Sequence, residues 1–223
     1  MLIVAQELTK IYHRGQEEIA ALRDISLQIP AGSFVFIVGP SGGGKSTLLH
    51  LLGGMDRPSS GQLSVNGIAL EKASEDQLTH FRRENIGFVF QFFNLLPSLN
   101  ALENVTLPLL ARREQPKHAR LMAAELLDQM GLASRKHHRP AELSGGEQQR
   151  VAIARAIIGK PVLIMADEPT GDLDTANAEA VIQLMHNLNQ SLRVTFVVAT
   201  HNEALIGKSD FVFELHNGEL RER

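Results

Sequence analysis

The residues with the clearest chemical capacity form a glycine-rich loop that ends in a lysine and two hydroxyl groups. The loop consists of Gly39, Pro40, Ser41, Gly42, Gly43, Gly44, Lys45, Ser46 and Thr47. It fits the pattern G-x-x-x-x-G-K-[ST]. In this pattern backbone N–H groups surround phosphate oxygens, the lysine reaches the β- and γ-phosphates and the hydroxyl ligates Mg²⁺. A plain flexible loop is the alternative, but this loop follows an apolar run and opens an apolar helix, as phosphate binding requires.

A second candidate site is an acidic pair. Asp167 and Glu168 directly follow the apolar run 162–166 and precede Pro169. Ligands bind at the carboxyl ends of strands in open α/β sheets, so a site is favoured over two solvated acids. We expect Asp167 to hold Mg²⁺ through water. The proline predicts an extended backbone at Glu168, and strand alternation predicts that the two acids point to opposite faces, one serving the metal and the other an attacking water.

A third candidate is a helix start at Ser144, Gly145, Gly146 and Glu147. The spacing of Ser144 and Glu147 predicts a capping box, which needs no ligand. It leaves the two glycines unexplained, and each costs roughly 1 kcal/mol relative to alanine within a helix. Close approach of a ligand to bare backbone would explain them. The N-terminus of this helix is therefore a second candidate anion site.

The elements that must position these residues alternate along the chain. The expected strands are 25–29, Phe34–Val38, Ile86–Phe90, 162–166, 194–199 and 211–215, and the expected helices are 47–52, 116–130 and 176–189. This alternation predicts an α/β fold with a mainly parallel sheet. The two ends of the chain, 1–30 and 209–223, read as short strands of an antiparallel layer, with turns at Arg14-Gly15 and Asn217-Gly218. We expect about 92–140 to be a helical subdomain inserted into a core of about 1–91 and 141–223.

Composition narrows the class of protein. A chain of 223 residues that is 43% hydrophobic and 21% charged predicts one folded unit and excludes global disorder. With a net charge of −3, the chain lacks the excess of basic residues that is typical of a non-specific nucleic-acid binder. Cysteine is absent, which excludes disulfides and thiol chemistry. We expect no signal peptide and no membrane-spanning helix, hence a cytoplasmic chain that reaches a membrane through a partner.

Residues 39–47, 143–147 (LSGGE) and 163–168 occur in the order that is typical of one family. Over nearly its whole length, the chain resembles the ATPase subunit of ABC transporters. The resemblance implies a P-loop NTPase fold with a RecA-like core, ATP and Mg²⁺ as cofactors, and ATP hydrolysis. It also implies a head-to-tail homodimer, in which each ATP lies between the phosphate loop of one chain and residues 144–147 of the other.

The resemblance implies roles for further residues. Tyr12 is similar to the aromatic residue that stacks on adenine, and Gln91 to the glutamine that meets Mg²⁺ and the attacking water. His201 resembles the histidine that contacts the γ-phosphate and steadies the carboxylate of Glu168. The implied catalytic residues are Lys45, Gln91, Glu168 and His201, and the implied metal ligands are Ser46, Gln91 and Asp167. The chain departs from the residues common in the family at Gly43, at Asp172 in the loop 171–174, and at Asn202.

Two strings point to one branch of the family. QFFNLLPSLNALENV and LLHLLGGMD resemble the branch of LolD, MacB and YbbA, whose members drive lipoprotein release, efflux or signalling across the envelope. Phe92, Phe93, Leu95 and Leu96 form a candidate patch for a helix of a partner. The branch implies a motor subunit on the cytoplasmic face of the inner membrane, bound to integral membrane permease subunits. The alternatives are a soluble ABC ATPase uncoupled from transport, an envelope regulatory ABC ATPase, and a small-molecule kinase with the same loop.

Overall fold

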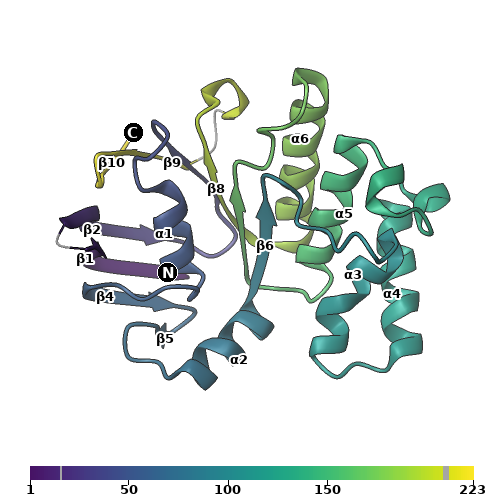
Figure 1. The fold of residues 1–223 in the computed structure, drawn as a ribbon, viewed down its shortest axis with the longest axis horizontal. Coiled ribbons are helices and arrows are strands. Elements are labelled where there is room, and N and C mark those ends of the chain that lie inside the picture. The colour runs from purple at the N-terminus through teal and green to yellow at the C-terminus, as the bar shows by residue number, and fades with distance from the viewer. Residues whose placement is uncertain (16, 208–210) are drawn as a thin grey trace.

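The computed structural model describes residues 1–15, 17–207 and 211–223. Its larger sheet has six strands (Figure 1). In spatial order its strands are β10 Glu219–Glu222, β9 Phe211–His216, β3 Phe34–Val38, β8 Thr195–Thr200, β7 Leu163–Asp167 and β6 Ile86–Phe90. All neighbours from β9 to β6 pair in parallel. Asp167 lies opposite Ala199 and Phe90, and Val38 lies opposite Thr200. The carboxyl ends of β3, β8, β7 and β6 therefore meet.

Alternation along the central strands divides the core into two halves. Phe34 and Phe36 of β3 join one apolar cluster, whereas Val35 and Ile37 join the other. The first cluster packs against the helices on the right of Figure 1, and the second against α1 and the smaller sheet on the left. Strands covered on both faces explain why these runs are continuously apolar in sequence. Asp167 follows Leu163 and Met165 at intervals of two residues along β7. Its side chain therefore points to the same face of the sheet as theirs, the face that α1 covers.

The smaller sheet is antiparallel. Its order is β2 Glu17–Ile29, β1 Ile3–Arg14, β4 Ser60–Val65 and β5 Ile68–Ala69. The antiparallel layer expected at the N-terminal end of the chain is confirmed, although its two strands are long rather than short. The same expectation for the C-terminal end is wrong for the described part, 211–223, because β9 pairs in parallel with β3 and extends the larger sheet. Only the β9–β10 hairpin is antiparallel there, around the Asn217-Gly218 turn.

The helices cover both faces of the larger sheet (Figure 1). They are α1 Lys45–Leu52, α2 Glu75–Asn85, α3 Ala101–Ala111, α4 Pro116–Gln129, α5 Gly145–Ile157 and α6 Thr175–Leu192, with 3-10 turns at Ala133–Arg135, Pro140–Glu142 and Glu203–Leu205. The expected helices are confirmed as α1, α4 and α6, whereas α2, β4 and β5 were not anticipated. Residues 92–140, all of them described, contain α3, α4, the 3-10 turn Ala133–Arg135, the first residue of a second 3-10 turn, and no strand. Within the described part of the chain, none of the helices is long and apolar enough to cross a bilayer.

Candidate active site

A cavity of about 810 Å³ opens where the strand ends meet the smaller sheet. Its lining residues are Tyr12, Ile19, Ala20, Ala21, Arg23, Ser41, Gly42, Gly44, Lys45, Ser46, Thr47, Asp167, Glu168, Asn217, Gly218 and Glu219. The structure thus brings most of the glycine loop, the acidic pair and Tyr12 around one space. A ligand of nucleotide size suits such a volume.

The glycine loop runs from the end of β3 into the first turn of α1. Gly39 and Gly44 have φ angles of 146° and 103°, which side chains rarely tolerate. Any Cβ at these positions would also lie 2.0 Å from the Leu215 carbonyl oxygen and 2.5 Å from that of Ala21, respectively. These glycines let the loop fold tightly against β9 and β2. The N-terminus of α1, with its partial positive charge, therefore faces the cavity.

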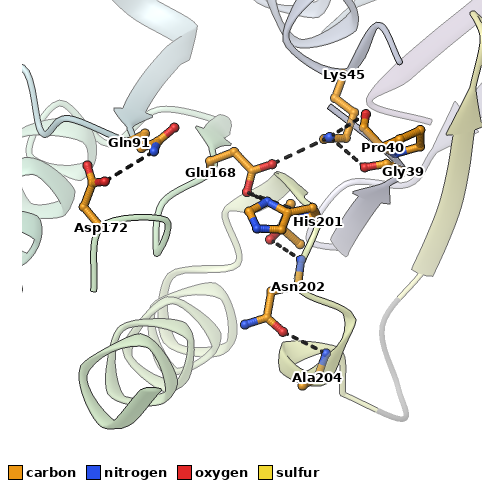
Figure 2. Close-up of polar contacts among 10 residues, drawn as sticks. Gly39, Pro40, Lys45, Gln91, Glu168, Asp172, His201, Asn202 and Ala204 are labelled. Atoms are coloured by element: carbon orange, nitrogen blue, oxygen red, sulfur yellow. Dashed lines mark hydrogen bonds and ion pairs between the residues drawn. The ribbon is translucent and has the colours of Figure 1, made fainter. Parts of the chain in front are cut away.

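Lys45, Glu168 and His201 form a connected cluster beside this loop (Figure 2). Lys45 is only 6% exposed, and its Nζ donates to the carbonyl oxygens of Gly39 at 2.8 Å and Pro40 at 3.2 Å. The same Nζ lies 3.6 Å from Glu168 Oε1. Glu168 Oε2 lies 2.9 Å from His201 Nδ1. The three side chains come from α1, the β7 end and the β8 end, so the parallel sheet is what assembles them.

The backbone at Glu168 differs from expectation. Its φ of 46° lies in the left-handed region, not the extended one that the following proline predicts. The Glu168 N–H donates to Ala199 O at 2.9 Å and its carbonyl accepts from Gly171 N–H at 3.0 Å, and these bonds override the local preference. Strand alternation therefore ends at Asp167. The prediction that the two acids point to opposite faces is wrong, because both line the cavity.

The two carboxylates nevertheless differ in their partners. Glu168 contacts Lys45 and His201, whereas Asp167 Oδ1 is buried and has no hydrogen-bond partner among the described residues. An unpaired buried acceptor is costly unless a ligand satisfies it. Mg²⁺ prefers carboxylate and other oxygen ligands, and Ser46 lines the same cavity. Asp167 and Ser46 therefore fit a Mg²⁺ site.

Tyr12 lies on β1 opposite Ile19 of β2, and its ring is 38% exposed. Its hydroxyl donates to Asp56 Oδ2 at 2.8 Å, while Lys10 Nζ lies 4.8 Å from the ring centroid and 2.7 Å from Asp56 Oδ1. Burial and the bond to Asp56 raise the pKa of the Tyr12 phenol. Burial opposes ionisation of Asp56, but hydrogen bonds from Lys10, Tyr12 and the Arg57 N–H hold the pKa of its carboxyl below the usual range. Asp56 follows α1, so the ring is anchored to the phosphate-loop helix.

Gln91 stands slightly apart from this cluster. It follows Phe90, the partner of Asp167 in the sheet, so it lies at the same edge. Its Nε2 contacts Asp172 Oδ1 at 3.4 Å (Figure 2). Gln91 is not among the residues that line the 810 Å³ cavity. The structure therefore joins Gln91 to the loop 171–174.

The helix start at 144–147 lies outside the cavity lining. The capping box forms: Ser144 Oγ accepts from Glu147 N–H at 3.3 Å, and Glu147 Oε2 accepts from Ser144 N–H at 2.8 Å. The bond from the Ser144 N–H, together with Arg135, lowers the pKa of the Glu147 carboxyl. Glu147 is thus engaged within its own chain.

The glycines of this helix start also have a packing role. Gly146 is buried, and a Cβ there would lie 2.8 Å from Asn177 Oδ1 of α6. A larger residue at Gly146 would therefore require the Asn177 side chain to shift, which the sequence did not reveal. Ser144 is exposed and Gly145 is partly exposed, so both can be reached by another molecule.

Two segments of the cavity were missed from the sequence. Four residues of β2 (Ile19, Ala20, Ala21 and Arg23) and the hairpin residues 217–219 line it. They meet each other because the Arg23 N–H donates to Gly218 O at 2.8 Å. The Asn217-Gly218 turn was visible in sequence, but nothing in the pattern indicates that it lies beside the phosphate loop.

Comparisons with known proteins agree on one family. The family model described as ABC transporter matches residues 22–171. A lipoprotein-releasing system ATP-binding protein LolD of Idiomarina loihiensis is 48% identical over 98% of this chain and 96% of its own. LolD of Colwellia psychrerythraea is 47% identical over 96% of this chain and 83% of its own. A solved dimeric structure of the ATP-binding cassette MJ0796, in a post-hydrolysis state with ADP and Pi, matches with a TM-score of 0.91 and 42% identity, covering 99% of this chain and 97% of that one.

Proposed function

The chain belongs to the ABC transporter family, and from this premise we propose that it is the ATP-hydrolysing motor subunit of a lipoprotein-releasing complex. ATP hydrolysis coupled to transport is the activity of the family. The observation that carries the assignment for this chain is the cluster of Lys45, Glu168 and His201 beside the glycine loop. The more specific role, lipoprotein release, rests on relatives that bear the name LolD. These names also favour a transport role over a soluble ABC ATPase.

In the proposed mechanism, the chain's own residues bind the triphosphate and move one proton. The N–H groups of the glycine loop and the Lys45 ammonium bind the β- and γ-phosphates. Glu168 accepts a proton from the attacking water, and His201 orients Glu168 while contacting the γ-phosphate. Lys45 and His201 stabilise the negative charge on the transferring phosphoryl group. Asp167 and Ser46, with Gln91 as a further candidate, would hold Mg²⁺, which when bound neutralises charge on the β- and γ-phosphates.

We assign Tyr12 to adenine, because its half-exposed ring lines the cavity and is held by Asp56. Base stacking on an aromatic side chain contributes about 1–3 kcal/mol. Tyr12→Ala should therefore weaken ATP binding by roughly 10-fold, whereas Tyr12→Phe, which keeps the ring, should retain most of the affinity. Calorimetric titration with ATP and with inorganic tripolyphosphate measures this. The tripolyphosphate has no base, so equal losses for the two ligands would contradict the assignment.

The proposed working unit is a homodimer. The related cassette MJ0796 is dimeric in its complex with ADP and Pi. In this chain Ser144 and Gly145 are accessible and lie away from the cavity, so they can reach a nucleotide only on another molecule. We propose that these residues, with Gly146 behind them, contact the γ-phosphate held by a second copy. Binding of ATP would then shift the population from separate to paired chains.

We propose integral membrane permease subunits as the second partner, which would hold this chain on the cytoplasmic face of the inner membrane. A groove of about 290 Å³ lies between β6 and α3 and is lined by Arg83, Ile86, Gly87, Phe88, Phe90, Asn94, Pro108, Arg112, Arg155, Ala156 and Gly159. Beside it Phe92 is 71% exposed and Leu96 is 46% exposed. Arg155 donates to the carbonyls of Phe93 and Asn94 and so fixes this segment. An apolar patch next to arginines suits a helix with apolar and acidic side chains.

Replacing Phe92 tests this docking site. Aromatic residues at the centre of an interface typically contribute about 2 kcal/mol or more, so Phe92→Ser should weaken association with the membrane subunit by at least about 10-fold. The measurement is the ratio of the chain to membrane subunits after extraction and purification of the complex. Leu192→Ser, at an equally apolar side chain that is 56% exposed on α6, is the control. Equal loss in the two variants would contradict docking at Phe92.

A further inference from the structure

Helix α5 carries a buried glutamine that the mechanism above does not use. Gln149 is 0% exposed, and its Nε2 donates to the carbonyl oxygen of Pro169 at 2.6 Å. Its Oε1 is buried without a hydrogen-bond partner among the described residues. A methionine of similar shape would avoid that unpaired acceptor. The bond to Pro169 is thus the one interaction that accounts for a polar side chain at this position.

Pro169 directly follows Glu168, the proposed general base. Proline has no N–H, so its carbonyl is the only backbone group through which a hydrogen bond can hold it. Pro169 is buried, and Gln149 supplies that bond. The two backbone hydrogen bonds of Glu168 go to Ala199 and Gly171. Gln149 therefore adds a third hydrogen bond to this turn, and this bond comes from helix α5.

The turn needs these hydrogen bonds because Glu168 has a φ of 46°. A non-glycine residue persists in the left-handed region only where its surroundings hold it there. In this conformation the carboxylate lies 3.6 Å from Lys45 Nζ and 2.9 Å from His201 Nδ1. Relaxation of the backbone toward the extended region would carry the carboxylate away from both groups.

We propose that Gln149 is a positioning residue for ATP hydrolysis, which holds Glu168 in its strained conformation through the Pro169 carbonyl. The proposal rests on the proposed function of this site. Gln149 lies one helical turn after Gly145, about 6 Å along the helix. Helix α5 thus carries both the residues proposed to contact the partner's nucleotide and Gln149. Gln149 bonds Pro169, the residue next to the proposed general base for the nucleotide bound by this chain.

Gln149→Met removes the donor while keeping the shape. Displacement of a catalytic group by about 1 Å can cost up to 10²-fold, so kcat for ATP should fall by about 10–100-fold. The KM for ATP and the affinity in a binding titration should change by less than about 3-fold, because the phosphate loop is untouched. Steady-state ATPase is measured on the full chain, alone and with its membrane subunits.

Asn189→Leu is the matched control. The Asn189 side-chain amide also donates to backbone carbonyls, those of Gly32 at 2.9 Å and Val194 at 2.7 Å, and none of these residues lines the cavity. Its loss should lower thermal stability with little change in kcat. Wild-type kcat in Gln149→Met, or a fall in kcat no larger than in Asn189→Leu at equal loss of stability, would overturn the proposal.

A second variant, Gln149→Glu, tests the hydrogen bond through the pH dependence of kcat, which a role in packing alone would leave unchanged. In Gln149→Glu the protonated acid can still donate to Pro169 O, whereas the carboxylate cannot. The ratio of its kcat to that of the wild type should therefore fall as the pH rises, and the corresponding ratio for Asn189→Asp should stay flat. A flat ratio for Gln149→Glu would also refute the proposal. A wild-type chain without ATPase activity, alone and in its complex, would instead refute the proposed function, and this proposal with it.

Discussion

Glu168→Gln should slow ATP hydrolysis by about 10²–10⁴-fold, the usual effect of removing a general base. The amide keeps the shape of the side chain and can still contact His201 and Lys45, but it cannot accept a proton from water. ATP binding should persist, because the glycine loop and Lys45 are unchanged. The measurement pairs steady-state ATPase with an equilibrium titration of ATP.

The control for this variant is another acid at the same edge of the sheet. Glu203 closely follows His201, is exposed, and pairs with Arg223 on the surface. Glu203→Gln changes the net charge equally but should leave turnover close to wild type. Turnover at the wild-type rate in Glu168→Gln would remove Glu168 from the mechanism. The assignment of the base would then have to move to His201 or to a water chain.

The same variant tests the dimer. With hydrolysis blocked, the γ-phosphate remains in place and the paired state should accumulate in saturating ATP. Sedimentation or light scattering would detect a doubling of mass that ADP does not produce. A strictly monomeric Glu168→Gln chain in saturating ATP, with membrane subunits supplied, would contradict the proposal that Ser144 and Gly145 contact a partner's nucleotide.

The sequence predicted the parts of the site that depend on strand ends. The runs that became β3, β7 and β8 are continuously apolar, and each is followed at once by residues of the site: Gly39, the acidic pair and His201. In a parallel sheet these ends must lie together, so the convergence of Lys45, Glu168 and His201 follows from topology. Local pattern was sufficient because Glu168 and His201 directly follow their strands, and Lys45 follows β3 after the glycine loop.

Features fixed by distant contacts were not predictable in this way. The left-handed φ of Glu168 is accompanied by backbone hydrogen bonds to Ala199 and Gly171, and a local preference before proline cannot anticipate the bond to Ala199 on another strand. The placement of β9 in the larger sheet depends on pairing with β3, which lies in the N-terminal part of the chain. The contact that a Cβ at Gly146 would make with Asn177 arises only from the approach of α6. In each case a deciding partner lies far away in sequence.

Lys45→Ala should abolish tight ATP binding. Hydrogen bonds from a charged donor contribute about 1.5–3 kcal/mol each, so loss of two phosphate contacts predicts at least about 100-fold weaker binding. The lower end of that range applies, since Lys45 already donates to Gly39 O and Pro40 O and exchanges these bonds for bonds to phosphate. The titration of ATP measures the effect directly.

The variant also removes the ammonium group that contacts the carbonyls of Gly39 and Pro40 and the carboxylate of Glu168. An effect on folding must therefore be distinguished from an effect on ATP binding. ATP stabilises the wild type against thermal unfolding by mass action, and this shift should vanish in Lys45→Ala even where the variant without ATP unfolds near the wild-type temperature. Lys136→Ala, at a lysine that is 21% exposed and paired with Asp128, should keep the full shift. Unaltered ATP affinity in Lys45→Ala would show that the backbone N–H groups of the loop and the start of α1 bind the triphosphate without the ammonium. Lys45 would then serve only to hold the carbonyls of Gly39 and Pro40.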